Sequence, residues 1–177
     1  MRGTALLVCL VSSTAGAQQP PTPTLPTPPP AAARAESVPP PPPPPPTLAQ
    51  ERFTRGLSTA GRGIAQLKIG IYSVVNAGRD APRLRQAGRR LAGFCGTARQ
   101  FMTSGRARMA ATAYEDSTAL KARRLSAQID TLIRFAPTCE AKAATQPDST
   151  TTRLLDEIRA YEAALKDFRA AIGLPNK

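Results

Sequence analysis

FTRGLSTAGRGIAQLKIGIYSVVNAG, residues 53–78, is the stretch that decides the fold of this 177-residue chain. Its apolar residues recur at alternating steps of four and three, and Gly78 continues the series: Phe53, Leu57, Ala60, Ile64, Leu67, Ile71 and Val74. Such a heptad seam is what coiled-coil-like packing of helices requires. Thr47 precedes the pattern and suits an N-cap, so the sequence predicts a helix from about residue 47 to residue 78.

A stripe of small residues runs beside this seam, one member at every seventh position: Ala49, Gly56, Gly63, Gly70 and Ala77. A glycine inside a helix costs roughly 1 kcal/mol. Three of them at one heptad position indicate that a neighbouring backbone comes close along this edge, within the chain or between chains. The alternative is a helix that is frayed or broken near Gly61 and Gly63. The seam passes through the glycines without a phase slip, which favours close packing.

Two further helices are expected directly after this one. Asp80 and Pro82 favour a start for the second helix, and Gly105 favours its end. A less regular third helix is predicted over residues 106–135, with a phase change near its middle that indicates a bend or a switch of packing partner. Pro137 is the expected stop of that helix.

The last helix is expected over residues 150–172, with Asp148 or Ser149 as its cap. No strand-like alternation occurs between residues 47 and 177, so the predicted fold is an all-α, antiparallel bundle of about four helices. The aromatic side chains fall mostly on the seams and are expected in the core, the tyrosines among them being Tyr72, Tyr114 and Tyr161.

Proline dominates the segment that precedes the bundle. Fifteen of the 19 prolines lie between residues 20 and 46, and the segment 18–46 offers few apolar groups that could form a core. It is therefore expected to be disordered, with a bias towards polyproline II. Two roles are open for it, a spacer or an arm that lies along a groove on a partner.

The first seventeen residues resemble an export signal. Arg2 is followed by a short apolar run over residues 5–11 and by the small-residue motif Ala15-Gly16-Ala17. Seven apolar residues are too few to span a bilayer, which needs about 20 in a helix. We therefore expect cleavage of residues 1–17 and a periplasmic or secreted protein.

Cleavage would leave two cysteines, Cys95 and Cys139, and an oxidising compartment favours a disulfide between them. A tight hairpin at Gly105 would, however, place Cys139 about 36 Å from the level of Cys95, at ~1.5 Å per helical residue. A bent third helix, a misplaced helix boundary or an intermolecular bridge could each explain this mismatch. We favour an intramolecular bridge and an error in the boundary.

Positive charge is concentrated in the second helix and the turn that follows it. Between residues 79 and 111 there are eight arginines and one acidic residue, Asp80, in a chain whose net charge is +12. Seven of these arginines form a candidate partner-binding patch: Arg83, Arg85, Arg89, Arg90, Arg99, Arg106 and Arg108. The patch could be a solvated face, a dock for an acidic protein surface, or a site for an anionic envelope polymer or lipid headgroups. Nucleic acid is disfavoured because interleaved aromatic residues are lacking.

The composition argues against an enzyme. The chain has no histidine, which excludes an imidazole base and the common zinc and haem motifs, and no glycine-rich nucleotide motif occurs. The carboxylate pairs Glu115-Asp116 and Asp156-Glu157 are adjacent on helices, so each pair points about 100° apart and is expected to be surface charge. No catalytic, cofactor or metal site is predicted.

The sequence thus predicts a non-enzymatic exported interaction protein. The favoured function is an accessory subunit or adaptor that docks on a larger periplasm-facing complex through the arginine-rich helix and the proline-rich arm. The alternative is a free periplasmic binding module for anionic envelope polymer, lipid headgroups or unfolded clients. The expected partner is a protein with an acidic surface, part of a membrane-bound complex in one version of the prediction.

Overall fold

The computed structural model describes residues 44–175, and over this range the chain is all-α. Its elements, in chain order, are α1 (Leu48–Ala77), α2 (Ala81–Arg106), the short 3-10 helix η1 (Ala111–Ala113), α3 (Asp116–Lys142) and α4 (Pro147–Ala171). The expected export signal, residues 1–17, and residues 18–43 of the proline-rich arm lie outside the described residues.

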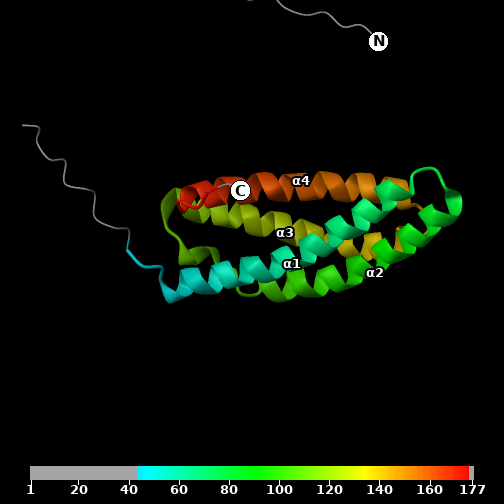
Figure 1. Cartoon of the computed structure of the whole chain (residues 1–177). Coiled ribbons are helices and arrows are strands. Elements are labelled where there is room, and N and C mark those ends of the chain that lie inside the picture. Colours follow the sequence, from blue (N-terminus) through cyan, green and yellow to red (C-terminus); the bar gives the residue numbers. More distant parts are fainter. Residues whose placement is uncertain (1–43, 176–177) are drawn as a thin grey trace, which may run out of the picture. The chain divides into compact units, whose positions relative to one another are not determined.

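The four helices lie alongside one another, and each runs antiparallel to the one before it (Figure 1). Contacts join α1 to α2, α2 to α3, α3 to α4 and α4 back to α1, so the helices enclose one core. Gly78 ends α1 with a φ of 57°, a positive backbone angle that glycine adopts without strain. The predicted fold class, an all-α antiparallel bundle of about four helices, is confirmed.

The start of α1 and its seam are as predicted. Thr47 and Gln50 form a capping box, in which the Gln50 backbone N–H donates to Thr47 Oγ1 at 3.3 Å and the Thr47 N–H donates to Gln50 Oε1 at 2.9 Å. All but one of the large seam residues are buried, the exception being the half-buried Leu57. The helix is thus held by its apolar face, which supplies most of the stability of a helix in a protein.

The glycine stripe of α1 packs against α2 within the same chain. A Cβ atom at Gly56 would lie 2.6 Å from the backbone oxygen of Gly105, and one at Gly63 would lie 2.7 Å from the backbone oxygen of Ala98. Real Cβ contacts are essentially never this short, so the two helix backbones approach as closely as hydrogen side chains allow. The prediction of close packing is confirmed, and the helix continues unbroken through Gly61.

The boundaries predicted for the third helix are wrong. Residues 107–115 form a connector that includes η1, and α3 starts at Asp116 instead of residue 106. The connector leaves the helical conformation because it closes one end of the bundle, where the side chains of Met109 and Tyr114 are buried. The phase change, expected near residue 120, falls a few residues after the border between the connector and α3, and α3 itself is one continuous helix.

Pro137 does not stop α3, which continues to Lys142. Proline inside a helix lacks an N–H and crowds the preceding turn, but Pro137 lies on the exposed side of α3. The opposite side buries Leu132, Ala136 and Cys139 in the core. This burial outweighs the local preference of proline and keeps the helix intact.

The predicted cap of the last helix is also misplaced. α4 starts at Pro147, with Gln146 in the N-cap position and no side-chain capping bond, so Asp148 and Ser149 already lie inside the helix. The first helical position tolerates proline because its N–H would have no partner there in any case.

Three aromatic rings fix the connector to the bundle. Phe53 of α1, Tyr114 of the connector and Phe168 of α4 lie with each pair of ring centroids 5.2 Å apart. Two of the three pairs have an edge-to-face geometry, which aromatic rings favour. The connector is therefore held at Tyr114 as well as at the buried Met109, so its position at this end of the bundle is fixed.

Tyr161 of α4 makes stability depend on pH in the alkaline range. Burial is the main cause that raises the pKa of its hydroxyl to about 12, from 10.0, while Glu162 adds to the shift and Arg169 opposes it. A pKa raised on folding gives stability that is complete below pH 10 and is lost as the pH rises towards 12. We expect the wild type to lose about 1.4 kcal/mol more than Tyr161→Phe between pH 8 and pH 11, measured by urea unfolding. An equal loss in both proteins would contradict the assignment.

Candidate binding surfaces

The two cysteines of the expected bridge meet in the core. Cys95 of α2 and Cys139 of α3 are both fully buried, and they are bonded with their Cα atoms 6.0 Å apart. The connector removes the mismatch expected from a tight hairpin at Gly105. It carries the chain beyond the end of α2 before α3 turns back, as Figure 1 shows, so Cys139 comes level with Cys95.

The seven arginines of the predicted patch do not share one face. Arg83 and Arg90 line a groove between α2 and α1. Arg85 and Arg89 are also exposed, but successive helical residues are turned by about 100°, so this pair projects from a different side of α2. The structure thus divides four clustered arginines into two pairs of equal charge.

The remaining three arginines of the patch differ in their surroundings. Arg99 and Arg108 are exposed, and neither forms an ion pair with any residue in the range 44–175. Arg106 is half-buried and faces α3, where it pairs with Asp130. It belongs to a pocket rather than to an open basic surface.

The groove that holds Arg83 and Arg90, called here the α1–α2 groove, has a volume of about 470 Å³. Its lining comes in equal parts from the end of α1 and the start of α2: Tyr72, Ser73, Asn76, Ala77, Arg83, Gln86, Ala87 and Arg90. Arg83 Nε lies 3.6 Å from Asp80 Oδ2, and the Arg83 side chain is 76% exposed, so this pair holds the guanidinium only weakly. Arg90 has no ion-pair partner among the described residues.

Three large apolar side chains are exposed on α1 near this groove. Ile69 is 56% exposed, Tyr72 68% and Val75 60%. The prediction that the tyrosines are in the core is wrong for Tyr72, because the neighbouring Ile71 occupies the seam and Tyr72 is turned about 100° from it. We call these three residues the apolar patch. Their position off the heptad seam is the feature of the sequence that could have predicted their exposure.

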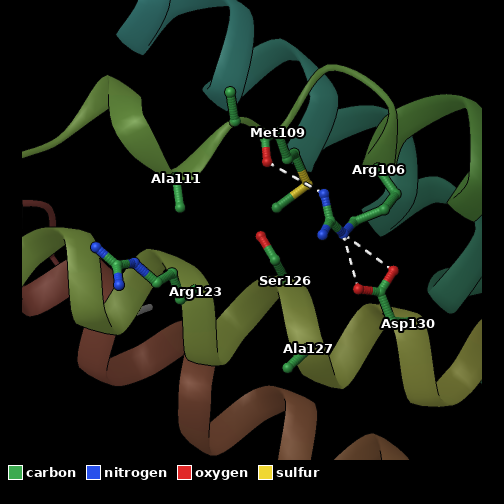
Figure 2. Close-up of a pocket in the computed structure, with 8 residues that line it drawn as sticks. Arg106, Met109, Ala111, Arg123, Ser126, Ala127 and Asp130 are labelled. Carbon is green, nitrogen blue, oxygen red and sulfur yellow. Dashed lines mark hydrogen bonds and ion pairs between the residues drawn. The ribbon is translucent and has the colours of Figure 1, made fainter.

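A second pocket lies between the connector and α3, and we call it the connector pocket (Figure 2). It has a volume of about 340 Å³ and combines four polar residues with four apolar ones: Arg106, Arg123, Ser126, Asp130, Met109, Ala110, Ala111 and Ala127. Only Arg106 of this set was among the sequence candidates. The others come from segments whose proximity depends on the path of the connector.

Arg106 is fixed in position at one side of the connector pocket. Its Nε donates to Asp130 Oδ2 at 3.1 Å, and its Nη1 donates to the backbone oxygen of Met109 at 3.2 Å. These bonds leave other guanidinium N–H groups of Arg106 without a partner in the described chain, since arginine carries five such donors.

Ser126 lies at the base of the same pocket. Its side chain is buried, with the residue 3% exposed, yet Ser126 Oγ has no hydrogen-bond partner among residues 44–175. A buried hydroxyl left without a partner costs about 1–3 kcal/mol. Thr131, one turn further along α3, shows the usual solution, because its hydroxyl donates to the backbone oxygen of Ala127.

The acidic pairs considered in the sequence do not converge into a site. Glu115 and Asp116 are both exposed at the start of α3, and Asp156 is exposed on α4 beside the half-buried Glu157. In the described part of the chain, no group of three Cys, Asp or Glu side chains could hold a metal ion. Between residues 44 and 175, no helix has the length and apolar character that a bilayer-spanning segment needs.

The fold and these surfaces define a class, an all-α four-helix protein with a buried cysteine bridge, a basic groove and a polar pocket. Comparison with protein-family models, with curated proteins and with solved structures finds no match for the chain. The argument for function therefore rests on the chemistry of the two surfaces.

Proposed function

We propose that this chain is a non-enzymatic, exported helical interaction protein, an accessory subunit or adaptor that docks on a larger periplasm-facing complex. It docks through the α1–α2 groove and the apolar patch, onto a protein surface that presents carboxylates around an apolar centre. The observation that carries this proposal is the position of Tyr72, which belongs to the apolar patch and also lines the groove together with Arg83 and Arg90.

The composition of this surface fits a protein partner. Protein interfaces have an apolar centre and a polar edge, and tyrosine and arginine are enriched among the residues that contribute most to binding. Ile69, Tyr72 and Val75 supply the apolar centre, since more than half of each side chain is exposed. Arg83 and Arg90 supply the charged edge.

The charge of the edge selects an acidic partner. Arginine binds carboxylates in a bidentate manner, which adds geometric specificity to the attraction. Nucleic acid is a weaker match, because unspecific strand binding uses successive aromatic platforms and Tyr72 is the one aromatic residue that lines this groove.

Export and a second contact complete the proposal. The N-terminal signal pattern supports export to an oxidising compartment, and the buried cysteine bridge is consistent with it. The proline-rich arm, residues 18–46, provides the second contact. Two weak contacts joined by one tether gain effective concentration, so neither needs high affinity alone.

The test compares two double variants that remove the same charge from different faces of α2. The tagged protein is purified from its native membranes as wild type, as Arg83→Ser/Arg90→Ser and as Arg85→Ser/Arg89→Ser, and partners are quantified by mass spectrometry. We expect the first variant to recover about tenfold less of a stoichiometric partner, because arginine is enriched among the residues that contribute most to binding at an interface. The second variant should recover the partner as the wild type does.

The outcomes separate the proposal from its alternative. Equal recovery with both variants, or recovery of the protein alone, would contradict docking through the α1–α2 groove. A salt titration then tests the alternative of a free module for anionic polymer, lipid headgroups or unfolded clients. Binding to a polyanion weakens steeply with salt, whereas a dock with an apolar centre largely survives it.

A further inference from the structure

The connector pocket has the features of a ligand site that is separate from the α1–α2 groove. Ser126 and Arg123 come from α3, Arg106 comes from the end of α2, and the connector lies opposite α3 across the pocket (Figure 2). Ser126 is buried, whereas Arg123 is exposed at the edge of the pocket. The connector is held at two points, by the buried Met109 and by the ring of Tyr114 between α1 and α4. The pocket is therefore preformed rather than a gap in a loose loop.

The hydroxyl of Ser126 is directed into this pocket. Figure 2 shows it pointing towards the connector, between the side chains of Arg106 and Arg123. Several other helical hydroxyls donate to the carbonyl four residues earlier, as Ser73 does to Ile69 and Thr97 does to Gly93. Ser126 makes no such bond although it is almost fully buried. Thr151 of α4 also has a buried hydroxyl without a partner among residues 44–175, but it lines neither of the two pockets. Because the Ser126 hydroxyl faces a pocket, it can donate to an acceptor that enters the pocket.

The charges around Ser126 select an anion. The lining contains two arginines and one carboxylate, that of Asp130, which is already paired with Arg106 at 3.0 Å. Arg123 forms no ion pair within the described range. The donors that remain available in the pocket are the hydroxyl of Ser126, the guanidinium of Arg123 and the unused N–H groups of Arg106, all of which suit a carboxylate or a phosphate.

The remaining walls indicate that the ligand also has an apolar part. Met109 presents its thioether, and the other three apolar lining residues are the alanines Ala110, Ala111 and Ala127. The volume of about 340 Å³ lies at the lower end of the range of small-molecule pockets. A bare inorganic anion would leave the apolar walls unused.

We propose that the connector pocket binds a small organic anion. Its carboxylate or phosphate head accepts hydrogen bonds from Ser126, Arg123 and Arg106, and its short apolar body packs against Met109 and the alanines. The proposal is independent of docking through the α1–α2 groove, since the two surfaces share no residue.

Benzoate and phenyl phosphate are suitable probes, because they combine an aromatic body with the two possible heads. Binding to the purified protein is followed by amide chemical shifts up to about 10 mM, which detects a Kd in the millimolar range. Benzyl alcohol, a body without charge, and inorganic phosphate, a head without a body, serve as controls. The stronger of the two organic anions identifies the head group, and both controls should bind at least about tenfold more weakly.

Variants then connect binding to the named donors. We expect Arg123→Gln and Ser126→Ala each to weaken binding of the stronger probe by about tenfold, as loss of a charge-assisted hydrogen bond does. The matched control is Arg124→Gln, because Arg124 is the neighbouring arginine on α3 and pairs with Asp167 of α4 outside the pocket. It should bind the probe as the wild type does.

A second measurement separates a binding role from a structural one. Without ligand, Ser126→Ala should be at least as stable to urea as the wild type, since it removes a buried hydroxyl that has no partner. The proposal is overturned by the absence of binding of both organic anions, by equal binding of the uncharged alcohol or of inorganic phosphate, or by variants at Arg123 and Ser126 that bind like Arg124→Gln.

Discussion

Cys95→Ala/Cys139→Ala is expected to lower the free energy of unfolding by about 4 kcal/mol. The bridge closes a loop with a sequence separation of 44 residues, and the chain-entropy model assigns roughly this value to a loop of such length. The apparent Tm should fall on the order of 10–20 °C for a domain of this size. Thermal unfolding followed by circular dichroism measures the change.

Reduction of the wild type provides the control for this prediction. A reductant should lower the Tm of the wild type towards that of the double variant, and it should leave the variant itself unchanged. The variant can be slightly less stable than the reduced wild type, because alanine fills less of the fully buried space around Cys95 and Cys139. A wild type whose cysteines are shown by thiol titration to be fully reduced, and whose Tm is nevertheless unchanged, would show that the bond contributes nothing to stability.

The part of the fold that sequence reasoning could predict is the part fixed by local patterns. The seam from Phe53 to Val74, the N-cap at Thr47 and the cap at Asp80 each depend on residues a few positions apart, and each is found as expected. The close approach of a neighbouring backbone to this edge of α1 was also predictable, because its signal is the seven-residue spacing of glycines on a single helix. That this neighbour is α2 of the same chain was left open by the sequence.

The errors arose where tertiary contacts override local preference. The sequence around Met109 and Tyr114 contains no strong helix breaker, yet closure of the bundle end takes it out of the helix. Pro137 was predicted to end α3, but burial of Ala136 and Cys139 on the other side keeps the helix continuous. Neither outcome can be derived from a short window of sequence.

The candidate surfaces show the same division. The charge concentration on α2 was visible in the sequence, and helical spacing alone separates Arg83 and Arg90 from Arg85 and Arg89. That the first pair lines a groove depends on the position of α1. The connector pocket could not be predicted, since Ser126 has no sequence signal that separates it from other helical serines. What distinguishes Ser126 is visible only in the folded state, where its buried hydroxyl has no hydrogen-bond partner among residues 44–175.

Gly63→Ala is expected to destabilise the bundle by about 2 kcal/mol, although alanine is the better helix former. The added Cβ would lie 2.7 Å from the backbone oxygen of Ala98 and 3.1 Å from Cβ of Phe101. A backbone oxygen in the middle of a helix cannot move alone, so α1 and α2 must separate along their length. Overpacking costs about 1–3 kcal/mol, and a clash with backbone, which cannot relax as a side chain does, lies at the upper end of this range. The gain of roughly 1 kcal/mol in helix propensity therefore leaves a net loss of about 2 kcal/mol.

Gly61→Ala is the matched control, because it makes the same chemical change two residues away on the same helix. A Cβ at Gly61 meets nothing within 4 Å, so only helix propensity acts, and the variant should be more stable than the wild type by about 1 kcal/mol. Urea unfolding of the two variants should therefore give changes of opposite sign. If both variants were stabilised, α1 and α2 would have to lie further apart than the glycine contacts indicate, and the small-residue stripe would have no packing role. If both were destabilised, the helix would be sensitive to substitution for a reason other than its contact with α2.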